Sequence, residues 1–135
     1  MLWRQADREK SRLGRGTSRG TSRHLECNLL RPNRLGLLEA AYEHCLAYEL
    51  EGRGLLVERQ LPLSIVYEGL RLEGAYRLDL LVGRSMIVEV KAVEALSRLH
   101  EAQLLTYMRL SGHRLGLLVN FNVELLKHGL RRLVL

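Results

Sequence analysis

Two charged residues interrupt the apolar stretch MIVEVKAV, which spans residues 86–93. Because side chains alternate faces along a β-strand, Glu89 and Lys91 point to the same face of this segment. Asp79 lies within a second apolar segment, YRLDLLV, which ends just before the turn residues Gly83-Arg84. A tight turn there would pair the two segments as a hairpin and make Asp79 a neighbour of Glu89.

Two carboxylates side by side repel each other unless a proton or a cation lies between them. Mg²⁺ meets that need, because it typically binds one or two carboxylates together with waters and substrate oxygens. A bound metal ion eases the deprotonation of water and polarises a phosphoryl oxygen, and Lys91 could orient that water or stabilise the phosphate charge. The same residues also fit a simpler arrangement, a hairpin that carries a Glu89–Lys91 salt bridge with Asp79 near a strand end.

Apolar patterns predict the elements that must position these residues. A 3.6-residue period predicts two helices, at residues 35–50 and 98–110. Strand-like runs, punctuated by Pro62 and by Glu68-Gly69, are predicted at residues 55–60, 63–67, 76–82, 85–93 and 114–120. A short helical turn after Asn122 and an apolar segment at residues 130–135 complete the order. This order indicates a mixed α/β domain with helices packed against one central sheet.

The positive charge of the chain is concentrated in its first 34 residues. They hold nine of the 21 Lys and Arg residues and three of the 15 Asp and Glu residues, so the remaining chain is neutral. The repeat RGTSRGTSR in this segment lacks apolar periodicity. We therefore expect residues 1–34 to form a basic, low-complexity and disordered arm, and residues 35–135 to form the folded domain. Such an arm could contact phosphates non-specifically, or it could be a solvated tail without function.

Composition argues against several classes of protein. The chain has no run of 18 apolar residues, which excludes a transmembrane helix. The N-terminus has no apolar stretch typical of a signal peptide, so we expect a cytoplasmic protein. Cys27 and Cys45 are far apart and lack a CxxC spacing, which argues against a structural zinc site and against a disulfide framework.

The pattern of Asp79, Glu89 and Lys91 has the spacing of the PD-(D/E)XK nuclease signature, which is weak when taken alone. The segment GLLEAAY at residues 36–42 resembles the motif that names the GxxExxY family, a bacterial and archaeal branch of that superfamily. The resemblance continues through YEG, YRLDLLV, IVEVKAV, HEAQLLTY and GLLVNF, and covers the chain from residue 36 nearly to its end. Leu78 stands at the superfamily's nominal proline, a variation that removes no ligand. The resemblance implies a PD-(D/E)XK nuclease-like fold of the α/β class, an αβββαβ core with a central mixed sheet flanked by helices.

Further site residues are implied by the resemblance. Glu39 would reach toward the metal from the first helix. It lies on the same side of that helix as Tyr42, so we expect it to face inward rather than to be an ordinary surface glutamate. Gln103 and Tyr107 look like the QxxxY motif of the exonuclease branch, and their i, i+4 spacing puts both on one helix face. Tyr107 could also be half-buried core, and His100 on the same face is expected to be solvated.

The resemblance implies a metal-dependent nuclease that hydrolyses nucleic-acid phosphodiester bonds, with Mg²⁺ or Mn²⁺ as cofactor and DNA expected ahead of RNA. The metal ligands would be Asp79, Glu89 and Glu39. Lys91 would activate the water, and Gln103 and Tyr107 would support the site. The alternative is a non-catalytic nucleic-acid-binding or protein-interaction module that keeps the nuclease fold. A homodimer is compatible with either function, and no membrane partner is expected.

Overall fold

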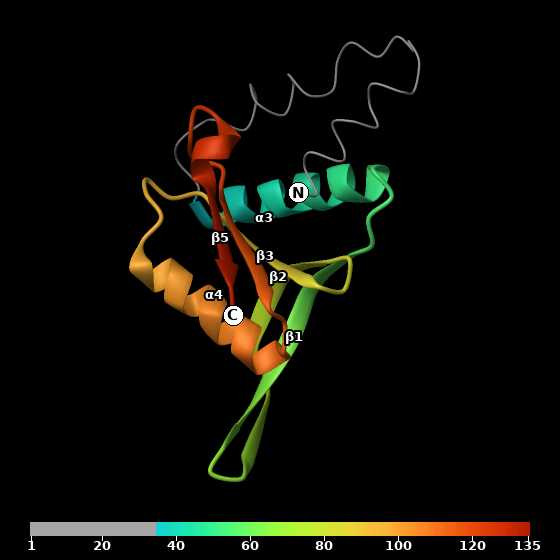
Figure 1. Cartoon of the computed structure of the whole chain (residues 1–135), viewed down its shortest axis with the longest axis vertical. Helices are drawn as coiled ribbons and strands as arrows, with labels where there is room; N and C mark the ends of the chain where they lie inside the picture. Colours follow the sequence, from blue (N-terminus) through green and yellow to red (C-terminus); the bar gives the residue numbers. More distant parts are fainter. Residues whose placement is uncertain (1–34) are drawn as a thin grey trace.

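The computed structural model describes residues 35–135, with side chains from Leu38 onward, so the predicted arm lies outside the described residues. A five-stranded mixed sheet in the order β1-β2-β3-β4-β5 forms the centre of this part (Figure 1). The sequence of elements begins with helix, three strands, helix and strand, which confirms the expected αβββαβ core. Within the described part, no helix is long and apolar enough to cross a membrane.

The first half of the domain is one helix followed by a three-stranded antiparallel meander. Helix α3 covers Leu35–Gly52, and the strands are β1 at Val57–Tyr67, β2 at Leu70–Val82 and β3 at Met86–Lys91. The helix was predicted correctly, but the prediction of two strands separated at Pro62 was wrong, because β1 runs through this residue. β1 lies at the edge of the sheet, where a residue without an N–H is tolerated.

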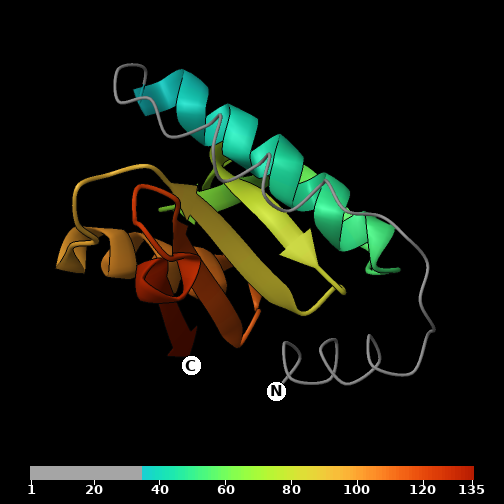
Figure 2. The same cartoon turned by 90° about the horizontal axis from the view of Figure 1, so that it is seen from above.

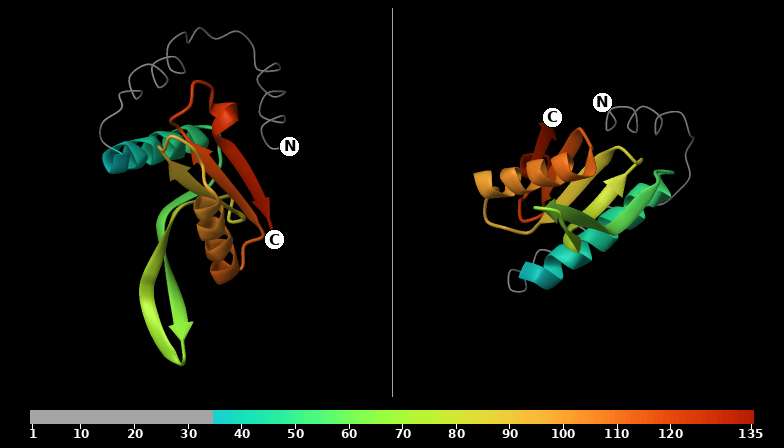
Figure 3. Two further views of the ribbon diagram at one scale, coloured as in Figure 1. Left: turned by 90° about the vertical axis from the view of Figure 1, so that its left-hand side faces the viewer. Right: turned by 90° about the horizontal axis from the view of Figure 1, so that it is seen from below.

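Strand β2 begins at Leu70, well before the predicted start at residue 76. Its first eight residues are all exposed, including the apolar side chains of Leu70 and Leu72. The outer parts of β1 and β2 form a long hairpin that projects from the body of the domain (Figures 1 and 3). The predicted turn at Glu68-Gly69 closes this hairpin, and both residues have positive φ, 46° and 83°.

The second half returns the chain to the sheet through helix α4, Arg98–Ser111. Its predicted caps are confirmed: Ser97 accepts a hydrogen bond from the His100 backbone N–H, and Gly112 adopts the left-handed conformation with φ 73°. The elements after α4 are β4 at Leu115–Asn120, the short 3₁₀ helix η1 at Leu126–Gly129 and β5 at Leu130–Val134. β4 is parallel to β3, and β5 is antiparallel to β4.

The two helices cover opposite faces of the sheet (Figure 2). On one face, Ala47 and Leu50 of α3 pack with Leu80, Val88 and Val119. On the other face, α4 contributes side chains to a second cluster that also contains strand residues: Leu104, Tyr107 and Met108 with Leu78, Leu81, Ile87 and Leu118. The sheet is therefore buried on both sides in its centre, as is usual for parallel strands such as β3 and β4.

The alternation of faces breaks at one position in each strand of the β1–β2 pair. In β2, Leu80 packs on the α3 side but Leu78 packs on the α4 side, so the break falls at Asp79. In β1, Val57 packs on the α3 side and Leu61 on the α4 side. The residue between them that leaves the ordinary β conformation is Gln60, with φ 52°. The hairpin therefore switches faces at the level of Gln60 and Asp79.

Candidate active site

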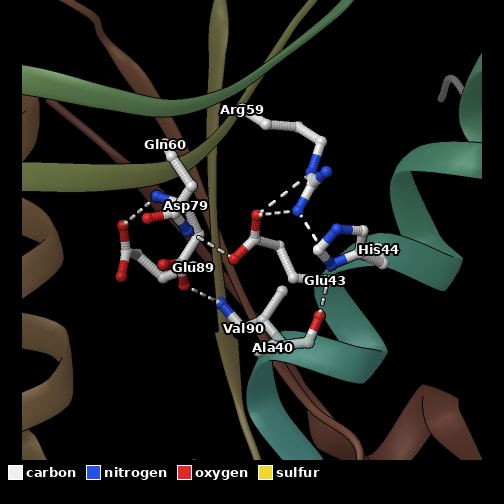
Figure 4. A network of polar contacts seen from close by, with 8 residues as sticks. All are labelled: Ala40, Glu43, His44, Arg59, Gln60, Asp79, Glu89 and Val90. Atoms are coloured by element: carbon white, nitrogen blue, oxygen red, sulfur yellow. Dashed lines mark hydrogen bonds and ion pairs between the residues drawn. The ribbon is translucent and has the colours of Figure 1, made fainter. Parts of the chain in front are cut away.

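Asp79 and Glu89 lie side by side where the pairing of β2 and β3 ends. The last paired residues are Leu80 and Val88, so Asp79 and Glu89 are next in the same register. Beyond Leu80 and Val88, backbone N–H groups donate to these two carboxyl groups and no longer to the backbone of the neighbouring strand. The Asp79 N–H donates to Glu89 Oε1 at 3.3 Å, and the Val90 N–H donates to Asp79 Oδ2 at 2.9 Å (Figure 4). The predicted juxtaposition of the two carboxyl groups is confirmed.

Burial makes both carboxyl groups reluctant to ionise. Glu89 is only 3% exposed, and this burial, with the negative charge of Asp79, raises the pKa of Glu89 to about 8. Burial also raises the pKa of Asp79, although the hydrogen bond from the Val90 N–H acts in the opposite direction. Both acids therefore hold a proton more tightly than they would in water.

Lys91 lies on the α4 side of the site and is held by the helix. Its Nζ donates to Gln103 Oε1 at 3.3 Å, and Gln103 Nε2 donates to the Tyr107 hydroxyl at 2.8 Å. Tyr107 is 6% exposed and belongs to the core, so it is both a packed side chain and a polar partner. The structure thus brings Lys91, Gln103 and Tyr107 together as one chain of hydrogen bonds.

The simpler interpretation, a Glu89–Lys91 salt bridge, is not what the structure contains. The ion pairs described among residues 38–135 include those of Arg59 with Glu43 and of Arg71 with Glu73, whereas Lys91 Nζ donates to Gln103. The positive charge of Lys91 still lowers the pKa of Asp79 and of Glu89, but less than burial raises it. Lys91 is therefore near the carboxylates without being neutralised by a contact ion pair.

Glu39 faces inward, as expected, and its Oε1 accepts a hydrogen bond from the Ala92 N–H at 3.1 Å. This contact attaches α3 to the end of β3. Among the side chains that the structure describes, no three of the Asp, Glu, His and Cys type are placed to hold one metal ion together. The role of Glu39 as a metal ligand therefore stays a prediction.

Glu43, one helical turn after Glu39, was not predicted as a site residue. It is 4% exposed, and its carboxylate accepts hydrogen bonds from Arg59 Nη2 at 3.0 Å and from Gln60 Nε2 at 2.5 Å. Figure 4 shows Glu43 to one side of the Asp79–Glu89 pair, with the side chains of Arg59 and Gln60 converging on its carboxylate. Its i+4 spacing from Glu39 would have placed it on the same inward stripe.

Two other polar residues stabilise the surroundings of the site. Buried Asn120, at the end of β4, accepts from the Val93 N–H at 3.0 Å and donates to the Val93 carbonyl at 2.8 Å, which fixes the chain just after β3. His100 lies outside the site and completes the α4 capping box, since its Nδ1 accepts from the Ser97 N–H at 3.0 Å. His100 was expected to be solvated, and its ring instead makes this local contact with the start of α4.

The carboxyl pair suits a hard divalent cation. Mg²⁺ requires only one or two carboxylates when waters and substrate oxygens complete its octahedron. Asp79 and Glu89 supply two adjacent carboxyl groups, and burial raises the pKa of both by more than the nearby charge of Lys91 lowers it. The chemistry of this pair therefore fits Mg²⁺ or Mn²⁺.

Comparison with known protein families matches residues 28–133 to the PD-(D/E)XK nuclease superfamily. The comparisons with curated proteins and with solved structures give no match. The matched segment includes both helices, strands β1 to β4 and all the residues of the site described above. With this match over most of its length, the chain belongs to the PD-(D/E)XK nuclease superfamily.

Proposed function

We propose that the protein is a metal-dependent nuclease of the GxxExxY branch that hydrolyses phosphodiester bonds in DNA. The observation that carries the proposal is the buried Asp79–Glu89 pair, with the raised pKa of both acids and with Lys91 close by but not ion-paired. A purely structural hairpin has no need for two adjacent buried acids, because each costs free energy unless it is paired.

Asp79 and Glu89 are the residues that would hold Mg²⁺ or Mn²⁺, with Glu39 as an assisting acid. When bound, the cation would supply Lewis acidity toward a phosphoryl oxygen and lower the pKa of a water. Lys91 is the group that would orient the attacking water or stabilise negative charge on the phosphate. Gln103 supports this role because it accepts a hydrogen bond from Lys91 Nζ, and Tyr107 in turn accepts one from Gln103.

Cleavage of nucleic acid by purified protein tests the proposal. Single-stranded and double-stranded DNA and RNA are incubated with Mg²⁺ or Mn²⁺, and with EDTA as the metal-free reaction. The matched variants are Asp79→Ala and Lys91→Ala, and the exposed Lys127→Ala is the control for loss of a lysine. We expect cleavage that requires the metal and disappears in both site variants but not in the control.

Two results would count against the proposal. Cleavage by Asp79→Ala and Lys91→Ala at the wild-type rate would identify a contaminating nuclease. Binding of DNA or RNA by the wild type without any cleavage would instead favour the non-catalytic binding module.

A further inference from the structure

Glu43 is a buried acid that the proposed reaction does not use. Its carboxylate receives both Arg59 Nε at 3.2 Å and Arg59 Nη2 at 3.0 Å on one oxygen, and Gln60 Nε2 at 2.5 Å on the other. The Arg59 guanidinium is the ion-pair partner of this buried carboxylate, and the three donors hold it in one orientation. Glu43 is therefore a fixed negative charge on the inner face of α3.

Gln60 has an unusual backbone for a strand residue. Its φ of 52° lies in the left-handed region, which disfavours residues that have a Cβ. The neighbouring pairs are Arg59 with Leu80 and Leu61 with Leu78, so Gln60 lies across from Asp79 in the register. This strained residue lies where the hairpin changes faces, and its side chain is the one that donates a hydrogen bond to Glu43.

Glu43 lies next to the carboxyl pair. Gln60, which donates to the Glu43 carboxylate, lies across from Asp79 in the register, and Figure 4 shows Glu43 beside Asp79 and Glu89. A negative charge close to two carboxylates strengthens their binding of a cation.

We propose that Glu43 is a positioning residue for the metal, held by Arg59 and Gln60, which raises the affinity of the Asp79–Glu89 pair for a divalent cation without binding it directly. This inference rests on the proposed function. Arg59 should have the opposite effect on the affinity for the cation, because its guanidinium partly neutralises Glu43. The inference also explains why an edge strand keeps a strained glutamine opposite Asp79.

The inference predicts opposite effects for the two partners of one ion pair. Glu43→Gln preserves the shape of the side chain but removes the charge, and should raise the dissociation constant for Mn²⁺ about tenfold, at the lower end of the range for residues around a metal site. Arg59→Gln leaves the charge of Glu43 less neutralised and should lower that constant. Glu51→Gln, an exposed glutamate of the same helix, should leave it unchanged.

Titration calorimetry of the full-length protein with Mn²⁺ alone measures these constants, and circular dichroism in EDTA checks that each variant is folded. Weaker binding by Glu43→Gln together with tighter binding by Arg59→Gln supports the inference. Weaker binding by both variants indicates a merely structural ion pair and overturns it, as does an unchanged constant in Glu43→Gln. If Glu43→Gln does not fold, Arg59→Gln alone tests the inference. Tighter Mn²⁺ binding by Arg59→Gln then supports it, and unchanged or weaker Mn²⁺ binding overturns it.

The same titration separates this inference from the proposed function. A wild-type protein that binds no Mn²⁺ contradicts the proposed metal site and the inference with it. A wild-type protein that binds Mn²⁺ as tightly as Glu43→Gln contradicts the inference alone.

Discussion

Replacing Glu89 with glutamine should remove most of the loss of stability that the metal-free wild type shows as the pH rises from about 4.5 to 8. The pKa of Glu89 rises from its ordinary 4.5 to about 8 on folding, mainly because the group is buried. The folded protein therefore binds this proton more tightly than the unfolded chain does. The resulting stability is fully present below about pH 4.5 and is lost as the pH rises toward 8, above which it levels off.

The size of the effect follows from the same two values. A rise from 4.5 to about 8 corresponds to roughly 5 kcal/mol, at about 1.36 kcal/mol for each pKa unit. This is an upper limit, because Asp79 lies beside Glu89 and the two acids share the uptake of protons. In Glu89→Gln the side-chain oxygen can still accept the Asp79 N–H, so the hydrogen bond is kept while the ionisable group is lost.

Urea unfolding in EDTA, followed by circular dichroism between pH 5 and 9, measures this prediction. At pH 5 the two proteins should differ little in free energy of unfolding, and at pH 9 the variant should be the more stable by up to a few kcal/mol. The exposed Glu94→Gln is the matched control and should follow the wild type. If wild type and Glu89→Gln lose stability in parallel with rising pH, the assignment of a raised pKa to Glu89 is wrong.

Two further predictions concern the support of the site and the packing of the sheet. Gln103→Leu removes the acceptor of Lys91 Nζ, so we expect the cleavage rate to fall about ten- to a hundredfold, with little change in the midpoint of urea unfolding. The control Thr106→Val, at an exposed position of the same helix, should keep the wild-type rate. A rate unchanged in Gln103→Leu would show that Lys91 needs no support from α4. Gly129→Ala would drive its Cβ into the Asn120 carbonyl oxygen, so it should destabilise the fold by about 1–3 kcal/mol in urea unfolding, while Gly52→Ala, with open space around it, should not.

The carboxyl pair could be predicted from local sequence because a short turn determines its register. Gly83 and Arg84 both adopt positive φ, 59° and 57°, and close a hairpin in which Asp79 and Glu89 follow directly after the last paired residues. The helix that carries Gln103 and Tyr107 was equally predictable, since its caps and its apolar period agree. In both cases the deciding contacts are close in sequence.

The rest of the site depends on contacts between distant elements. Glu43 and Gln60 are 17 positions apart, and no local pattern indicates that they meet. The start of β2 in the outer hairpin was not predicted, because its alternation of apolar and polar residues lasts only from Leu70 to Glu73 and is followed by Gly74. The change of faces at Gln60 follows from a backbone conformation that glutamine rarely adopts, so propensity argues against it.

The central claim is that Asp79 and Glu89 share one divalent cation. Crystals of the wild type soaked in Mn²⁺ and measured at the manganese absorption edge test it most directly. We predict one anomalous difference peak within bonding distance of both carboxyl groups, and its absence in crystals of Asp79→Ala soaked in the same way. A map without a peak at the pair, or with a peak that contacts neither carboxyl group, would contradict the claim.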